Sequence, residues 1–149
     1  MATTRRETVR LLCKSIITRL ENQKSIDFPP RLRQVVQDDV YNLVGPYILT
    51  DEDLRDRALK KMGVKADVLS DSSATESDQY RAAKAVVRST FGDDELNGLY
   101  FQKPVKSIAG EMTAYFMRSA QIDEVYESDA DMERKIVEII QHFKESDMH

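Results

Sequence analysis

Few residues in this chain have the type and spacing that a chemical reaction requires. The single cysteine, Cys13, lies between Leu12 and Ile16 in an apolar pattern of helical period, which predicts a buried thiol that packs like a hydrophobic side chain. A reactive thiolate would need exposure and a neighbouring base, and the sequence supplies no evident partner. Cys13 is therefore predicted to be a core residue that takes part in no reaction.

Histidines and carboxylates also fall short of a recognisable site. A helix would place Glu138, His142 and Glu145 on one face, but no second histidine or ligating cysteine completes a zinc pattern. Neighbouring carboxylates occur at Asp38–Asp39, at Asp93–Asp94, and in clusters at 51–53 and 123–131. General acid–base catalysis needs two carboxyl groups that converge in a cleft, whereas these are sequence neighbours at helix starts or on solvated faces. The sequence thus predicts no enzyme, cofactor or metal site.

A basic stripe is the first candidate for binding. Arg6, Arg10 and Lys14 recur every four residues, and Arg31 adds charge at the start of the next helix. The stripe is interpreted either as a site for phosphate groups or an acidic partner, or as an ordinary solvated helix face. Aromatic residues do not interleave with these positions, so stacking on nucleic-acid bases is not predicted.

The second candidate is the apolar tripeptide Leu99, Tyr100 and Phe101, which lies outside a clean helical pattern. It is interpreted either as part of the core between two halves of the chain or as an exposed docking patch. Together with the basic stripe, these three residues make up the predicted interaction surface.

Helices must position these residues. Apolar residues at helical spacing predict six helices, over about 9–20, 30–44, 51–62, 79–92, 103–120 and 128–146. Thr3 or Thr4 is expected to cap the first helix, and the pairs Thr50–Asp53 and Ser128–Asp131 to cap the third and last. Gly110 weakens the fifth helix, which a close helix crossing would justify. No strand is predicted, so the expected fold is all-α: one domain over 1–149, built as a compact bundle of about six helices.

A shift of 96 residues suggests an internal repeat. It brings the apolar positions of the first helix onto those of the fifth, and Ile26–Asp27 onto Ile122–Asp123. Two related halves, 1–63 and 79–149, joined by the polar linker 64–78, are one interpretation; two ordinary helices that end alike are the other. Residues 1–62 hold 12 basic and 9 acidic residues and the rest 10 and 17, so the halves could attract each other.

One family shows a similar order of elements. The run "VRLLCKSIITRLENQKSIDF", a second helix and then "LTDEDLRDRALKKM" resemble the small bacterial helical proteins of Domain of Unknown Function family 507, chiefly over residues 5–62. The segment "MERKIVEIIQHFKE" is similar to that family's closing helix, whereas the middle section 64–102 and the acidic end depart from the pattern. The resemblance implies a soluble helical protein and transfers no functional residue.

Composition sets the remaining expectations. The chain has 149 residues, 41% of them hydrophobic and 32% charged, and its apolar runs fall short of the roughly 20 residues that a membrane span requires. One cysteine fits a reducing, cytoplasmic setting. The predicted function is a non-enzymatic module for protein–protein interaction, with another protein or a second copy as partner. The alternative is nucleic-acid binding through Arg6, Arg10, Lys14 and Arg31, which the net charge of -4 disfavours.

Overall fold

The structure, a computed structural model, describes residues 4–61 and 95–144. Its helices are α1 (Arg6–Asn22), α2 (Arg33–Val44), α3 (Asp51–Lys61), α6 (Val105–Arg118) and α7 (Asp129–His142), with 3-10 turns at Pro30–Leu32 and Gly45–Tyr47. Its strands are β1 (Ile26–Asp27), β2 (Ile48–Thr50), β3 (Glu95–Leu96), β4 (Leu99–Phe101) and β5 (Glu124–Val125). The predicted helix over 79–92 and the linker 64–78 lie outside the described residues.

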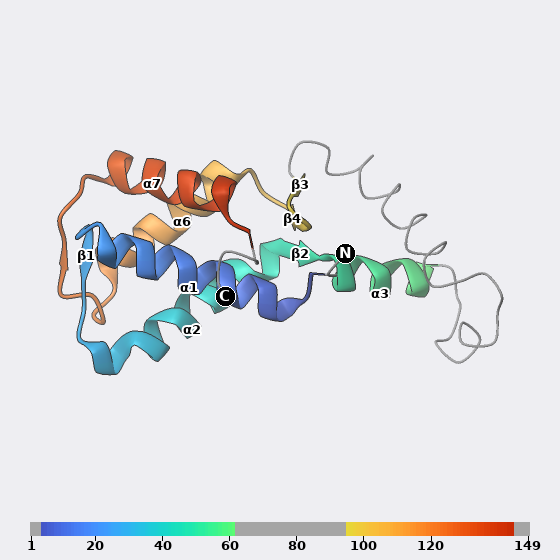
Figure 1. Ribbon diagram of the computed structural model, residues 1–149, viewed down its shortest axis with the longest axis horizontal. Coiled ribbons are helices and arrows are strands. Elements are labelled where there is room, and N and C mark those ends of the chain that lie inside the picture. The colour runs from blue at the N-terminus through green and yellow to red at the C-terminus, as the bar shows by residue number, and fades with distance from the viewer. Residues whose placement is uncertain (1–3, 62–94, 145–149) are drawn as a thin grey trace.

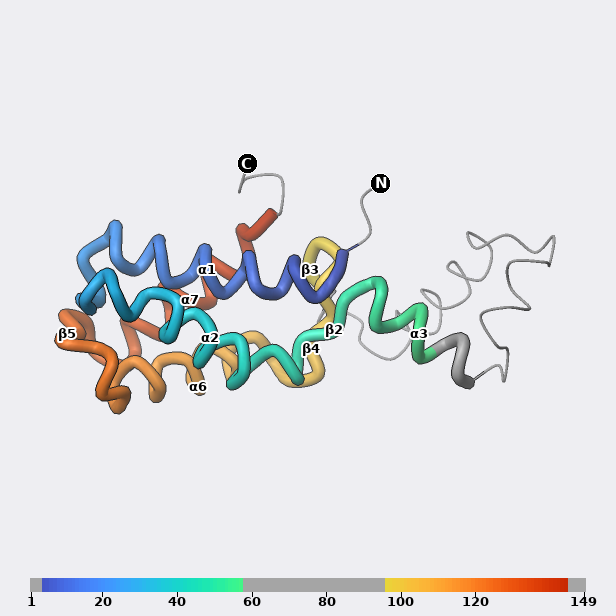
Figure 2. The backbone as a smooth tube through the Cα atoms, turned by 90° about the horizontal axis from the view of Figure 1, so that it is seen from below, coloured from blue at the N-terminus to red at the C-terminus, as the bar shows by residue number. Residues whose placement is uncertain are grey.

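The mostly helical character predicted from the sequence is confirmed, whereas the expectation of no strand is wrong. Helices α1, α2, α6 and α7 form a four-helix bundle in which α1 packs on α2 and α7, and α6 packs on the same two helices (Figures 1 and 2). The predicted apolar face of α1 fills the core, with Leu12, Ile16 and Leu20 fully buried. Met132 and Ile136 of α7 lie in the same core as these three residues of α1.

The bundle consists of two helical hairpins tied together at one end. The connector of the first hairpin holds β1 and that of the second holds β5, and these strands pair antiparallel, with Asp27 opposite Glu124. The amide of Asp123 donates to the carbonyl of Asp27 at 2.9 Å. The two Ile-Asp dipeptides that suggested a repeat therefore lie in adjacent connectors. The hairpin partner of α1 is α2 rather than α3, so the proposed duplication stays a prediction.

A three-stranded antiparallel sheet, in the order β2-β4-β3, lies at the other end of the bundle (Figure 1). Ile48 pairs with Phe101 and Thr50 with Leu99. The turn between β3 and β4 is Asn97–Gly98, and both residues have positive φ, 52° and 84°, as a tight hairpin turn of this kind requires. A methyl group on Gly98 would lie 2.7 Å from a side-chain carbon of Thr4, so the turn packs closely against the start of the chain.

Helix α3 extends away from the bundle and is attached through its first turn (Figure 2). The predicted cap is confirmed: the amide of Asp53 donates to the Thr50 hydroxyl at 3.3 Å, and the Thr50 amide donates to the Asp53 carboxylate at 2.9 Å. Thr4 does not cap α1 as predicted. Its hydroxyl accepts from the amide of Asp51 at 2.8 Å and donates to the carbonyl of Gly98 at 2.6 Å. Thr4 thus joins the first turn of α3 to the β3–β4 turn.

The structure also bears on the predicted cap of the last helix and on the glycine at position 110. Ser128 caps α7 as predicted, since its hydroxyl accepts from the Asp131 amide at 3.2 Å. Space does not require a glycine at position 110, because a methyl group there would meet the Glu133 carboxylate at 3.8 Å, an ordinary contact. No helix in the described ranges 4–61 and 95–144 is long and apolar enough to cross a membrane.

Candidate interaction surface on helices α1 and α2

Arg6 belongs to a structural network, not to an exposed basic stripe. Its guanidinium donates to the carbonyls of Ile48 and Gly45 at 2.7 and 2.8 Å, to the Tyr41 hydroxyl at 3.0 Å, and to the Asp53 carboxylate at 3.0 Å. Burial opposes its charge, but the bonds to Tyr41 and Asp53 outweigh this effect and raise the pKa of the guanidinium. Arg6 therefore joins α1 to the α2–β2 junction and to the first turn of α3, which corrects the predicted binding role.

Asp53 is the acidic partner in this network. Burial tends to raise the pKa of its carboxyl group, but the amide and hydroxyl of Thr50 and the guanidinium of Arg6 prevail and lower it below its ordinary value of 3.8. Both members of the Arg6–Asp53 pair are thus charged at neutral pH. The capping pattern of α3 predicted the contact between Thr50 and Asp53. No local pattern predicted that Arg6 would bind Asp53.

Arg10, by contrast, lies on the surface and is held in place there. Its guanidinium carbon is 4.1 Å from the centroid of the Tyr41 ring, and its Nη1 is 3.7 Å from Asp38 Oδ1. Gln34 fixes the same Asp38 oxygen with a hydrogen bond of 3.0 Å. Because 57% of the Arg10 side chain stays exposed, the group is both ordered and accessible to a partner.

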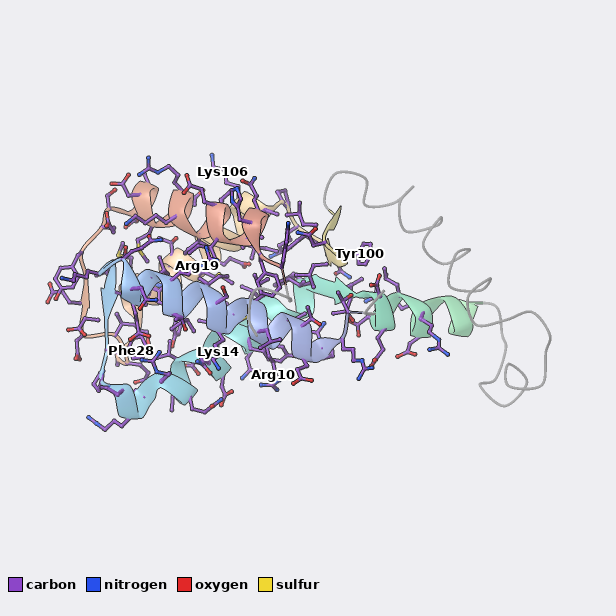
Figure 3. The ribbon with its side chains drawn as sticks, in the orientation of Figure 1. Arg10, Lys14, Arg19, Phe28, Tyr100 and Lys106 are labelled. Atoms are coloured by element: carbon purple, nitrogen blue, oxygen red, sulfur yellow. The ribbon has the colours of Figure 1, made fainter. Side chains whose placement is uncertain are left out.

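Lys14 is exposed one turn further along α1. Figure 3 shows Arg10 and Lys14 on the side of α1 that faces α2, and Arg19 on the side nearer α7. Arg31 is also exposed but precedes α2, whereas Tyr41 follows ten residues later in the last turn of that helix. About 15 Å therefore separates Arg31 from the Arg10–Tyr41 contact. We call the surface formed by Arg10, Lys14, Asp38 and Tyr41 the α1–α2 face.

The interpretation of Leu99, Tyr100 and Phe101 as a docking patch needs correction. Strand β4 is the central strand of its sheet, and the three residues are only 2%, 3% and 0% exposed. Leu99 and Phe101 belong to the bundle core, while Tyr100 packs with Leu49 and Leu54 and donates to Asp51 Oδ1 at 2.7 Å. These residues do not contribute to an exposed surface, which agrees with the alternative that placed them in the core.

Among the candidates for chemistry, Cys13 lies in the core as predicted. Cys13 is buried, and burial raises the pKa of its thiol to about 12. The exposed ring of His142 places Nδ1 2.8 Å from the carbonyl oxygen of Glu138, whereas Glu145 and the Asp93–Asp94 pair lie outside the described residues. Within the part of the chain that the structure describes, no three metal-ligating side chains come together.

Sequence reasoning missed a hollow of about 440 Å³ at the connector end of the bundle. Glu21, Lys24, Ile26 and Asp27 line it together with Tyr126, which is 60% exposed. Tyr126 reaches this place because its amide donates to the carbonyl of Ser25 at 2.9 Å. No local signal could have revealed the hollow, since its walls come from connectors about a hundred residues apart.

Comparison with known proteins adds no further information on this surface. No family model matches the chain, and no curated protein or solved structure matches it either. The resemblance to Domain of Unknown Function family 507 accordingly stays a prediction.

Proposed function

We propose that the protein is a non-enzymatic helical module that binds a protein partner through the α1–α2 face. The observation that carries the proposal is the exposed Arg10 guanidinium, held over the Tyr41 ring and beside Asp38. Arginine and tyrosine are the residue types that dominate binding energy at protein interfaces. Because Arg10 is already ordered, less side-chain entropy is lost when a partner binds it.

The charges favour a partner that carries carboxylates. The Arg10–Asp38 pair is about half exposed on both sides, so its own stabilisation is small and a partner carboxylate can replace Asp38 at little cost. Lys14 follows one helical turn, about 5.4 Å, further along α1. A partner helix with two acidic residues four positions apart matches the spacing of Arg10 and Lys14. Such charges also speed up association and set its specificity.

Nucleic-acid binding, the alternative function, has less support. Arg6 is committed to internal contacts, so the basic stripe loses one of its members. The Tyr41 ring is covered by the guanidinium of Arg10, so no base can stack on the same side.

The test compares two double variants that change the net charge equally. Arg10→Glu with Lys14→Glu reverses the α1–α2 face, whereas Arg19→Glu with Arg118→Glu reverses two exposed arginines elsewhere on α1 and α6. We expect proteins cross-linked to the wild type to be recovered equally by the control and to be depleted at least about tenfold with the first variant. Circular dichroism establishes that both variants keep the helical content of the wild type.

Two results would overturn the proposal. One is an identical set of cross-linked proteins for both double variants, because the face would then make no contribution to binding. The other is a salt-sensitive shift of a DNA or RNA duplex that only the Arg10→Glu, Lys14→Glu variant loses, since that outcome assigns the face to nucleic acid.

A further inference from the structure

A second surface, on the opposite hairpin, has features of an interface between two copies of the chain. A groove of about 570 Å³ runs along α6 and α7, and its lining includes Lys106, Ala130, Glu133, Arg134, Val137 and Glu138. Val137 is one residue beyond the fully buried Ile136, so it points about 100° away from the core direction. It leaves an apolar, β-branched side chain partly exposed in the groove. Gly110 of α6 adds no side chain near Glu133 on the same side.

The charges of the groove are self-complementary. Arg134 and Glu138 lie one turn apart on α7, on either side of Val137 along the helix, and both are exposed. The intrachain partner of Arg134 is Asp131, at 3.3 Å, but these two side chains are 65% and 50% exposed, so the pair is weak and exchangeable. When a second α7 lies antiparallel on the first, Arg134 of each copy faces Glu138 of the other. A two-fold axis then forms the same ion pair twice and brings the two Val137 side chains together.

We propose that the α6–α7 groove binds a second copy of this chain, with the two α7 helices antiparallel across a two-fold axis. This interface does not use the α1–α2 face, so it is independent of the proposed function. A dimer of this form leaves Arg10 and Lys14 of both copies exposed and would present two partner-binding faces at once, which strengthens binding to a partner with two acidic helices.

The size of the surface sets the expected affinity. Helix α7 has 14 residues and is therefore about 21 Å long. With α6 beside it, the face is roughly 20 Å wide, which gives about 400 Å² per copy and about 800 Å² in total. Stable interfaces bury more than about 1,000 Å², so the dimer is expected to be weak and to form only at micromolar concentrations or above.

The experiment uses charge reversal on the full-length chain, measured by sedimentation velocity from low micromolar to near-millimolar concentration. We expect the wild type to shift from monomer to dimer over this range. Arg134→Glu alone and Glu138→Arg alone each create two repulsive pairs and weaken the dimer by at least about tenfold. A mixture of these two variants restores association, because a helix with acidic residues at both positions 134 and 138 then faces a helix with basic residues at both.

The mixture also serves as the folding control, since only folded helices can pair in this way. Arg118→Glu, an exposed reversal on α6, should dimerise like the wild type. A wild type that stays monomeric at the highest concentration overturns the proposal. So does a dimer that both single reversals leave intact, because another surface must then hold it, and so does a mixture that associates no better than either variant alone.

Discussion

Replacing Arg6 with methionine tests whether this arginine joins the bundle to the sheet and to α3. Methionine keeps the aliphatic volume but removes four hydrogen bonds, two of them to the carbonyls of Gly45 and Ile48. Bonds to a charged donor contribute about 1.5–3 kcal/mol each when buried. The Arg6 and Asp53 side chains are 35% and 26% exposed, so solvent screening reduces their ion pair to about 1 kcal/mol or less. At the lower end of the range the two carbonyl bonds contribute about 3 kcal/mol, so with the ion pair we expect Arg6→Met to lower the free energy of unfolding by about 3–4 kcal/mol.

The pH dependence of this loss gives a second signature. The folded-state pKa of Asp53 lies below its ordinary value of 3.8, so its ion pair and hydrogen bonds stabilise the fold above about pH 3.8. That contribution disappears as the pH falls through the lower, folded-state pKa. The part of the difference between wild type and Arg6→Met that comes from the ion pair should therefore shrink below pH 3.8, and the part from the two carbonyls should persist.

Urea unfolding followed by circular dichroism measures both quantities, provided that the transition is two-state. Arg19→Met on the same helix is the matched control, because Arg19 is exposed and its loss should change the stability by no more than about 0.5 kcal/mol. If Arg6→Met and Arg19→Met lower the free energy of unfolding equally, the contacts of Arg6 do not stabilise the fold. If the loss for Arg6→Met is the same at all pH values, the ion pair with Asp53 contributes nothing.

Two further substitutions and one labelling reaction each test the surroundings of a single residue. Gly110→Ala should stabilise the protein by about 0.5–1 kcal/mol in thermal unfolding, because the added methyl group meets only Glu133 at an ordinary distance and alanine favours a helix. A loss of stability would mean that α6 and α7 pack more closely than described. Gly98→Ala should lower the free energy of unfolding by about 2 kcal/mol or more in the same assay, since φ is positive there and the methyl group would lie 2.7 Å from Thr4. An unchanged stability would contradict the described turn. Cys13 should react with a thiol reagent only as fast as the protein unfolds, because burial raises its pKa to about 12, and rapid labelling of the folded protein would show that the thiol is accessible.

The helices could be predicted because their apolar residues recur at helical period over several turns. Leu12, Ile16 and Leu20 follow this period and all reach the core. The strands could not, because two or three residues are too short for a period of two to show. The Asn97–Gly98 pair was a local hairpin signal before the apolar β4, but the partner strand β2 lies about fifty residues away.

The candidate surface was predicted less well than the helices. The spacing along α1 placed Arg6 and Arg10 on one stripe. The turn at Gly45 gives the two arginines different surroundings. That turn brings two carbonyls and Asp53 to Arg6, whereas Arg10 meets Tyr41 at the surface. Contacts of this kind depend on residues far away in the sequence, which a helical pattern does not encode.

The position of Thr4 has a consequence for how the start of the chain is linked to two distant turns. Its hydroxyl contacts both Asp51 and Gly98, so one side chain near the start of the chain links two residues that are 47 positions apart. Loss of that one hydroxyl should therefore release two contacts together, one to the first turn of α3 and one to the β3–β4 turn, so both elements should loosen at the same time.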